Sequence, residues 1–131
     1  MLIAALIAIL SAPVAGQAAP LFRPFDAPVI APAVAAPDCG GETAFTGATC
    51  LTAPAGQTDA LIQAYSDRLY TLSWIEVDGS DRRRAFVRRR DGGGCDGLQM
   101  LAVERGDTVL LVFARTPGDA CAAPPSAGAA A

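Results

Sequence analysis

The segment richest in reactive side chains runs from Arg82 to Gly97 and reads RRRAFVRRRDGGGCDG. Guanidinium groups bind phosphate and carboxylate oxygens strongly, and a glycine run can expose backbone N–H groups to the same anions. Because alternate side chains of an extended chain share a face, Arg88 and Arg90 point one way and Arg89 points the other. We therefore predict Arg88 and Arg90 as the residues that bind an anionic ligand. The competing interpretation is a solvated strand end.

Four carboxylates are the remaining candidates for acid–base chemistry, because the chain contains no histidine, no lysine and no asparagine. Those absences exclude histidine-based triads, lysine Schiff bases and histidine ligation of zinc. A hydrolase would need two of the carboxylates in one cleft. No catalytic motif joins them, so we favour a non-enzymatic function without cofactor or metal and keep a carboxylate-dependent hydrolase as an alternative. The four residues are Asp67, Asp91, Asp96 and Glu76.

The four cysteines, Cys39, Cys50, Cys95 and Cys121, predict two disulfides. An even number of cysteines in a small exported domain is typical of such bridges, and no CxxC motif indicates a redox or metal site. Three pairings are open to four cysteines. We favour Cys39–Cys50, which closes a short loop, and Cys95–Cys121, which joins the open end of a predicted hairpin.

The N-terminal text is typical of a signal peptide over residues 1–18, with a short apolar run followed by small residues. The run is interrupted at Pro13, too early for a stable membrane span. Export predicts a periplasmic or secreted protein. Residues 19–37 are rich in proline and alanine and indicate a linker or strap. Residues 38–121 then form the domain, and residues 122–131 form a disordered low-complexity tail.

A length of 131 residues limits the chain to one small domain. The net charge of −3 is mild, so no overall field attracts nucleic acid, and we expect none as a partner. The lack of lysine and asparagine beside abundant alanine, proline and arginine is a bias typical of GC-rich bacterial genomes. Arginine is then the default cation of this chain and says little by itself about ligand recognition.

The periodicity predicts one helix and four strands. Thr58 is a candidate N-cap, and apolar residues spaced by three and four predict a helix over residues 59–69. Four β-rich runs follow, separated by turn residues, and they predict an antiparallel meander of two hairpins. The expected fold is α+β, with the helix packed on a four-stranded sheet. A small β-barrel with an accessory helix is the alternative. The strands are expected at 72–78, 82–90, 98–104 and 108–114.

Charge selects a register for the first hairpin. A three-residue loop at 79–81 places Asp78 opposite Arg82 and Glu76 opposite Arg84, whereas the two-residue alternatives bring acids together. The same register brings Arg90 near the ring of Tyr70, where a cation–π contact is expected.

The second hairpin is predicted to turn over residues 105–107, which pairs Val103 with Val109. In that register both faces of the hairpin are apolar, so each needs a cover. The rest of the chain can supply that cover, or one face can remain as a surface for a partner. We therefore favour a domain that binds or supports another envelope or extracellular component. Binding of an anionic envelope ligand through the arginines is the alternative.

Overall fold

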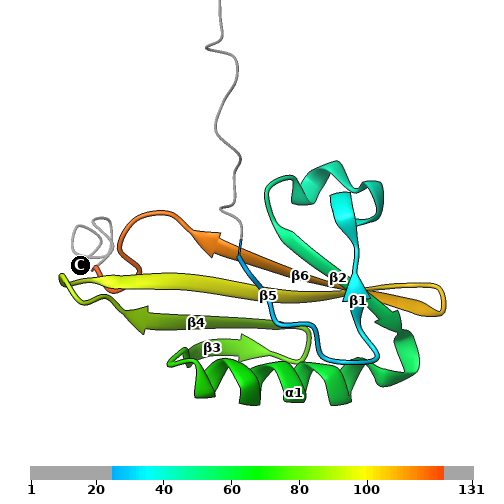
Figure 1. The fold of residues 1–131 in the computed structure, drawn as a ribbon, viewed down its shortest axis with the longest axis horizontal. Coiled ribbons are helices and arrows are strands. Elements are labelled where there is room, and N and C mark those ends of the chain that lie inside the picture. The colour runs from blue at the N-terminus through cyan, green and yellow to red at the C-terminus, as the bar shows by residue number, and fades with distance from the viewer. Residues whose placement is uncertain (1–24, 123–131) are drawn as a thin grey trace, which may run out of the picture.

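The computed structural model describes residues 25–122, which form one sheet and one long helix (Figure 1). All neighbouring strands are antiparallel, in the order β1-β2-β6-β5-β4-β3. The predicted signal peptide and all but the first residue of the predicted tail lie outside the described residues. The elements are β1 (Val34–Ala35), η2 (Pro37–Gly41), η3 (Thr43–Phe45), β2 (Thr49–Pro54), η4 (Ala55–Gln57), α1 (Thr58–Thr71), β3 (Ile75–Ser80), β4 (Arg83–Arg89), β5 (Cys95–Arg105) and β6 (Thr108–Thr116).

The sheet has six strands, so the prediction of four is wrong. The additional strands are β1, which lies in the predicted strap, and β2, which begins at the end of the predicted Cys39–Cys50 loop and continues beyond it. β2 pairs along its whole length with β6 and shields that edge of β6 from water. The sheet is open, with β1 and β3 at its edges, so the barrel alternative is also wrong. A small domain with one α-helix and an antiparallel sheet is confirmed.

β5 and β6 are joined by a tight turn at residues 106–107, and the predicted three-residue loop is wrong. Val109 lies opposite Glu104 instead of Val103. The backbone of Gly106 has a φ of 65°, which is the left-handed conformation that a two-residue hairpin uses. A register shift of one residue regroups the side chains on the two faces of a sheet.

The observed register sorts the apolar side chains of β5 and β6 into two cores, one on each face. Both faces are therefore apolar, as predicted, although with different members. The first core contains Leu98, Met100, Ala102, Val109, Leu111 and Phe113, and the second contains Leu101, Val103, Leu110 and Val112.

α1 covers the first core and lies beside β3 in Figure 1. The predicted apolar face is confirmed, but the helix starts and ends beyond the predicted range. Thr58 is not the N-cap, because Gln57 precedes the helix and the Thr58 hydroxyl donates to the carbonyl of Ala55 at 2.7 Å. Within residues 25–122 no helix is long and apolar enough to span a bilayer. The buried side chains of the helix are Thr58, Leu61, Ile62, Tyr65 and Leu69.

Residues 25–33 complete the first core by packing beside α1. Tyr65, which is fully buried, holds this segment in place. Its hydroxyl oxygen accepts the N–H of Ile30 at 3.0 Å and donates to the carbonyl of Pro28 at 2.8 Å. Burial raises the pKa of the Tyr65 hydroxyl, so the group stays protonated and able to donate.

The segment 37–48 covers the second core and stands next to β1 and β2 in Figure 1. Phe45 packs against the sheet, and the predicted disulfide between Cys39 and Cys50 closes the segment. Asp38 and Cys39 have φ values of 63° and 52°. Left-handed backbone costs about 1–2 kcal/mol for each residue other than glycine. The disulfide and the apolar contacts therefore have to hold this turn in place.

The β3–β4 hairpin turns at residues 81–82, and the predicted loop at 79–81 is wrong. A bulge at Val77 takes up one residue and shifts the pairing, so Asp78 no longer lies opposite Arg82. The sequence does not reveal this bulge, because Val77 fits the alternation of an ordinary strand.

The charges of this hairpin pair in a way that only partly follows the prediction. The expected ion pair between Glu76 and Arg84 is present at 3.3 Å, although the two residues are not direct cross-strand partners. Arg82 contacts Asp59 on α1 and Glu104 on β5, both at 3.5 Å. The first arginine triplet thus joins the hairpin to the helix and to the central strands.

The substitution Tyr65→Phe should lower the free energy of unfolding by about 1–3 kcal/mol, because the buried N–H of Ile30 loses its acceptor. Tyr70→Phe is a matched control, since Tyr70 is 69% exposed, and it should change stability by less than about 0.5 kcal/mol. Urea denaturation followed by circular dichroism measures both. Equal effects of the two substitutions would contradict the role of Tyr65 in holding residues 25–33.

Candidate functional site

Three guanidinium groups meet at the carboxylate of Asp96 on β5. The Nε of Arg90 and an Nη of Arg115 each lie 2.9 Å from Oδ1, and an Nη of Arg88 lies 4.0 Å from Oδ2. The register explains the meeting, because Arg88 lies directly opposite Asp96 and Arg115 follows the same face of β6. We call these four residues the arginine cluster. It holds three positive charges and one negative charge.

Arg88 is held by an aromatic ring as well as by Asp96. Its guanidinium carbon lies 4.3 Å from the centre of the Trp74 ring, a cation–π contact. Trp74 is 1% exposed and occupies the connection between α1 and β3. The predicted contact of Arg90 with Tyr70 is wrong, because the bulge in β3 changes the register and Arg90 bonds to Asp96.

The arginines lower the pKa of Asp96 below its ordinary value. The largest contribution is the hydrogen bond from Arg90, and the charges of Arg115 and Arg90 add to it against the opposing effect of burial. Asp96 is therefore ionised at neutral pH. An external anion would share these guanidinium groups with an internal carboxylate.

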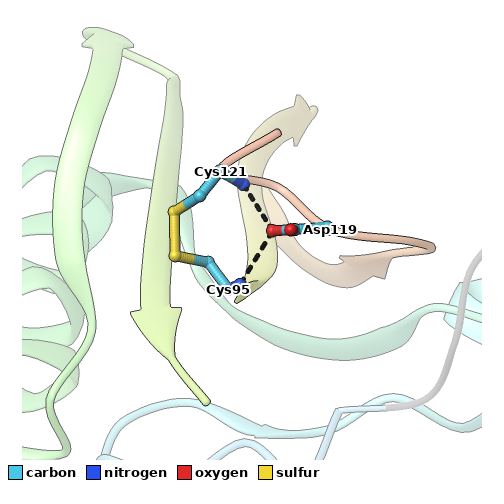
Figure 2. A group of neighbouring side chains, drawn as sticks. All are labelled: Cys95, Asp119 and Cys121. Carbon is cyan, nitrogen blue, oxygen red and sulfur yellow. Dashed lines mark hydrogen bonds between the residues drawn. A yellow bond between two sulfur atoms is a disulfide. The ribbon is translucent and has the colours of Figure 1, made fainter. Parts of the chain in front are cut away.

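A disulfide-closed turn borders the cluster, and Figure 2 shows its centre. Oδ1 of Asp119 accepts the backbone N–H groups of Cys95 at 2.8 Å and Cys121 at 2.9 Å, and these two bonds lower the pKa of Asp119. The predicted disulfide Cys95–Cys121 is present. These three residues are close enough to hold a metal ion, but both sulfurs are in the disulfide and neither is a thiolate. Arg90 also donates to the carbonyl of Gly118 in this turn.

The structure places Arg88 and Arg90 together on Asp96. Arg89 does not contact Asp96 and lines, together with Arg88, a hollow beside the Cys95–Cys121 disulfide. Sequence reasoning missed Arg115. The available signal was the β5–β6 register, since the two-residue turn puts Arg115 opposite Leu98 and on the face of Asp96.

The carboxylates considered for acid–base chemistry are mostly engaged with other side chains. Glu76 pairs with Arg84, and Asp67 accepts a hydrogen bond from Gln63 at 2.9 Å. Asp96 has a lowered pKa, whereas a general acid at neutral pH needs a raised one. None of these contacts, among the described residues, brings two of the four candidate carboxylates together as an acid–base pair.

Exposed apolar side chains flank Trp74 along the sequence. Tyr70, Leu72, Ile75 and Val77 are large apolar residues between 44% and 69% exposed. They follow one another from the end of α1 into β3, which is an edge of the sheet. We call these four residues the edge surface. Ile75 lines the same hollow as Arg88, so the edge surface reaches the cation of Arg88.

The substitution Asp96→Asn should lower stability at pH 7 by about 1–3 kcal/mol, because it removes charge-assisted hydrogen bonds from Arg90 and Arg115 and an ion pair with Arg88. Since the folded-state pKa of Asp96 is depressed, its contribution exists above the ordinary value of 3.8 and is lost as the pH falls through the folded-state pKa. The difference from wild type should therefore shrink below about pH 3.8. Denaturation curves at several pH values measure it.

Asp91→Asn is the control for Asp96→Asn, because Asp91 is an exposed acid in the adjacent turn. It should change stability by less than about 0.5 kcal/mol at every pH. If the loss in Asp96→Asn stays constant with pH, the arginine cluster does not stabilise the fold through the ionised carboxylate.

No protein-family model, no curated protein and no solved structure matches this chain. A function for this chain therefore has to be inferred from the arrangement of its own side chains.

Proposed function

We propose that this chain is a non-enzymatic, exported domain that binds another protein through the edge surface, with Arg88 at the rim. One observation carries the proposal. Six large apolar side chains are strongly exposed among the described residues, and four of them lie between positions 70 and 77. Exposed apolar residues that cluster in this way mark interaction sites. The two disulfides and the predicted signal peptide support a periplasmic or secreted location.

The edge surface favours docking through side chains over the addition of a long strand. β3 pairs with β4 on one side only, so its outer backbone groups face away from the sheet. The bulge at Val77 and the acidic side chain of Asp78 interrupt that edge. Bulges and charges are devices by which proteins prevent unwanted strand pairing. A partner is therefore held chiefly by burial of the four apolar residues.

Apolar burial alone gives a weak complex. Covering four half-exposed large side chains contributes roughly 3–6 kcal/mol, whereas association costs an estimated 4–15 kcal/mol. Additional interactions must supply the remaining binding free energy, and Arg88 is placed to supply one of them. Its guanidinium lies on Trp74 and only 4.0 Å from Asp96, so donors remain for a carboxylate of the partner. The partner surface we expect is apolar with an acidic rim.

Photo-reactive amino acids test the proposal by position. Placed at Leu72 or Val77 in the full chain, expressed in its natural compartment, they should cross-link to one defined protein. Placed at Ala60, an exposed position near the start of α1, the same group should give no such product. Cross-linking should weaken with salt, because Arg88 contributes a charge.

The identified partner must then bind the purified domain directly. Val77→Asp should weaken that binding at least about tenfold, while Ala60→Asp leaves it unchanged. Cross-links that form equally from all three positions, that form from none, or that join only two copies of this chain would overturn the proposal.

A further inference from the structure

A groove borders the Cys95–Cys121 disulfide where β4 ends. Its first part has a volume of about 520 Å³ and is lined by Ile75, Val87 and the disulfide, with Ser73, Arg88 and Arg89 as its polar residues. Its second part, of about 500 Å³, shares Arg89 and the disulfide with the first and continues along the glycine-containing turn after β4. Because the two parts have these lining residues in common, they form one groove.

The sheet geometry gives the groove a floor and a wall. Phe86 is buried in the core beneath α1, so the next residue, Val87, points to the opposite face. Ile75 and Gly97 flank Val87 on the neighbouring strands. A Cβ at Gly97 would collide with Thr116 and Ala120, so the disulfide-closed turn lies directly on β5 there. The turn forms a wall, and the apolar side chains of Ile75 and Val87 form the floor.

The charge at the junction of the two parts is not neutralised within the described chain. Arg88 and Arg90 contact Asp96, but Arg89 makes no ion pair with any residue from 25 to 122. Asp91 lines the second part of the groove, away from Ile75. Because Arg89 has no ion-pair partner among these residues, an anion is favoured beside it, and apolar surface extends from there toward Ile75.

We propose that this groove binds one molecule of a single-chain amphiphile with an anionic head group. The chain lies on Ile75, Val87 and the disulfide, and the head pairs with Arg89. The volume of each part is within the range of about 300–1,000 Å³ that is usual for small-ligand sites. This ligand site is additional to the protein-binding function proposed above and shares Ile75 with the edge surface.

Alkyl phosphates of increasing length test the apolar part directly. Octyl, decyl and dodecyl phosphate are titrated below their micelle concentrations into the oxidised full chain, and binding is followed by calorimetry. The affinity should rise about two- to fourfold for each added methylene until the groove is full. Inorganic phosphate and dodecyltrimethylammonium should not bind, because one lacks the chain and the other carries a cationic head.

Substitutions separate this site from general charge effects and from the edge surface. Arg89→Ser should weaken decyl phosphate binding at least about tenfold. Arg83→Ser is the matched control, because Arg83 is exposed on the same strand and the same face and does not line the groove. Ile75→Ser should flatten the dependence on chain length, whereas Val77→Ser should not. Thermal melts verify folding.

Four outcomes would overturn the amphiphile site. They are equal binding of inorganic phosphate, equal loss in Arg83→Ser and Arg89→Ser, an affinity independent of chain length, and binding to phosphatidylglycerol vesicles without binding to the monomers. Although Ile75 belongs to both sites, failure here is distinguishable from failure of the edge surface, because Leu72 and Val77, which carry the cross-linking and Val77→Asp tests, do not line the groove.

Discussion

The central strands β5 and β6 carry apolar side chains on both faces, and both faces must be shielded from water. α1 and residues 25–33 shield one face. The described residues contain no second α-helix, and the segment 37–48, closed by the Cys39–Cys50 disulfide, shields the other face. A bridge over so short a loop stabilises by about 3 kcal/mol in the chain-entropy model, which is comparable with the cost of about 2–4 kcal/mol for left-handed backbone at Asp38 and Cys39.

These two covers shield only part of the sheet from water. At the ends of β4, β5 and β6, ion pairs take the place of apolar packing. The ends of β4, β5 and β6 are tied together where Arg88, Arg90 and Arg115 meet Asp96. Both sheet edges resist pairing, because β1 has two residues and β3 carries a bulge. Side-chain surfaces remain available at the β3–β4 side, namely the edge surface and the groove beside the disulfide. Both proposed sites result from this incomplete cover.

The sequence reveals elements whose periodicity is strong and misses those that depend on a single turn residue. The helix face, the apolar hairpins and both cysteine pairs could be predicted, because each follows from spacing. β2 could not, since its six residues lack clear alternation and stand beside prolines and glycines. The hairpin registers failed at Gly106 and Val77, where one residue changes every later pairing. That error also concealed Arg115, whose place in the arginine cluster depends on the β5–β6 register.

Hydrogen–deuterium exchange of the purified, oxidised full chain tests most directly whether the β3 side of the sheet is uncovered. Amides in the middle of β5 and β6, such as those of Met100 and Leu111, should exchange slowest, because they are buried and paired on both sides. The outward amides of β3 should exchange orders of magnitude faster. Protection of β3 equal to that of β6 would contradict the account, because it would mean that the edge is already covered in the isolated protein.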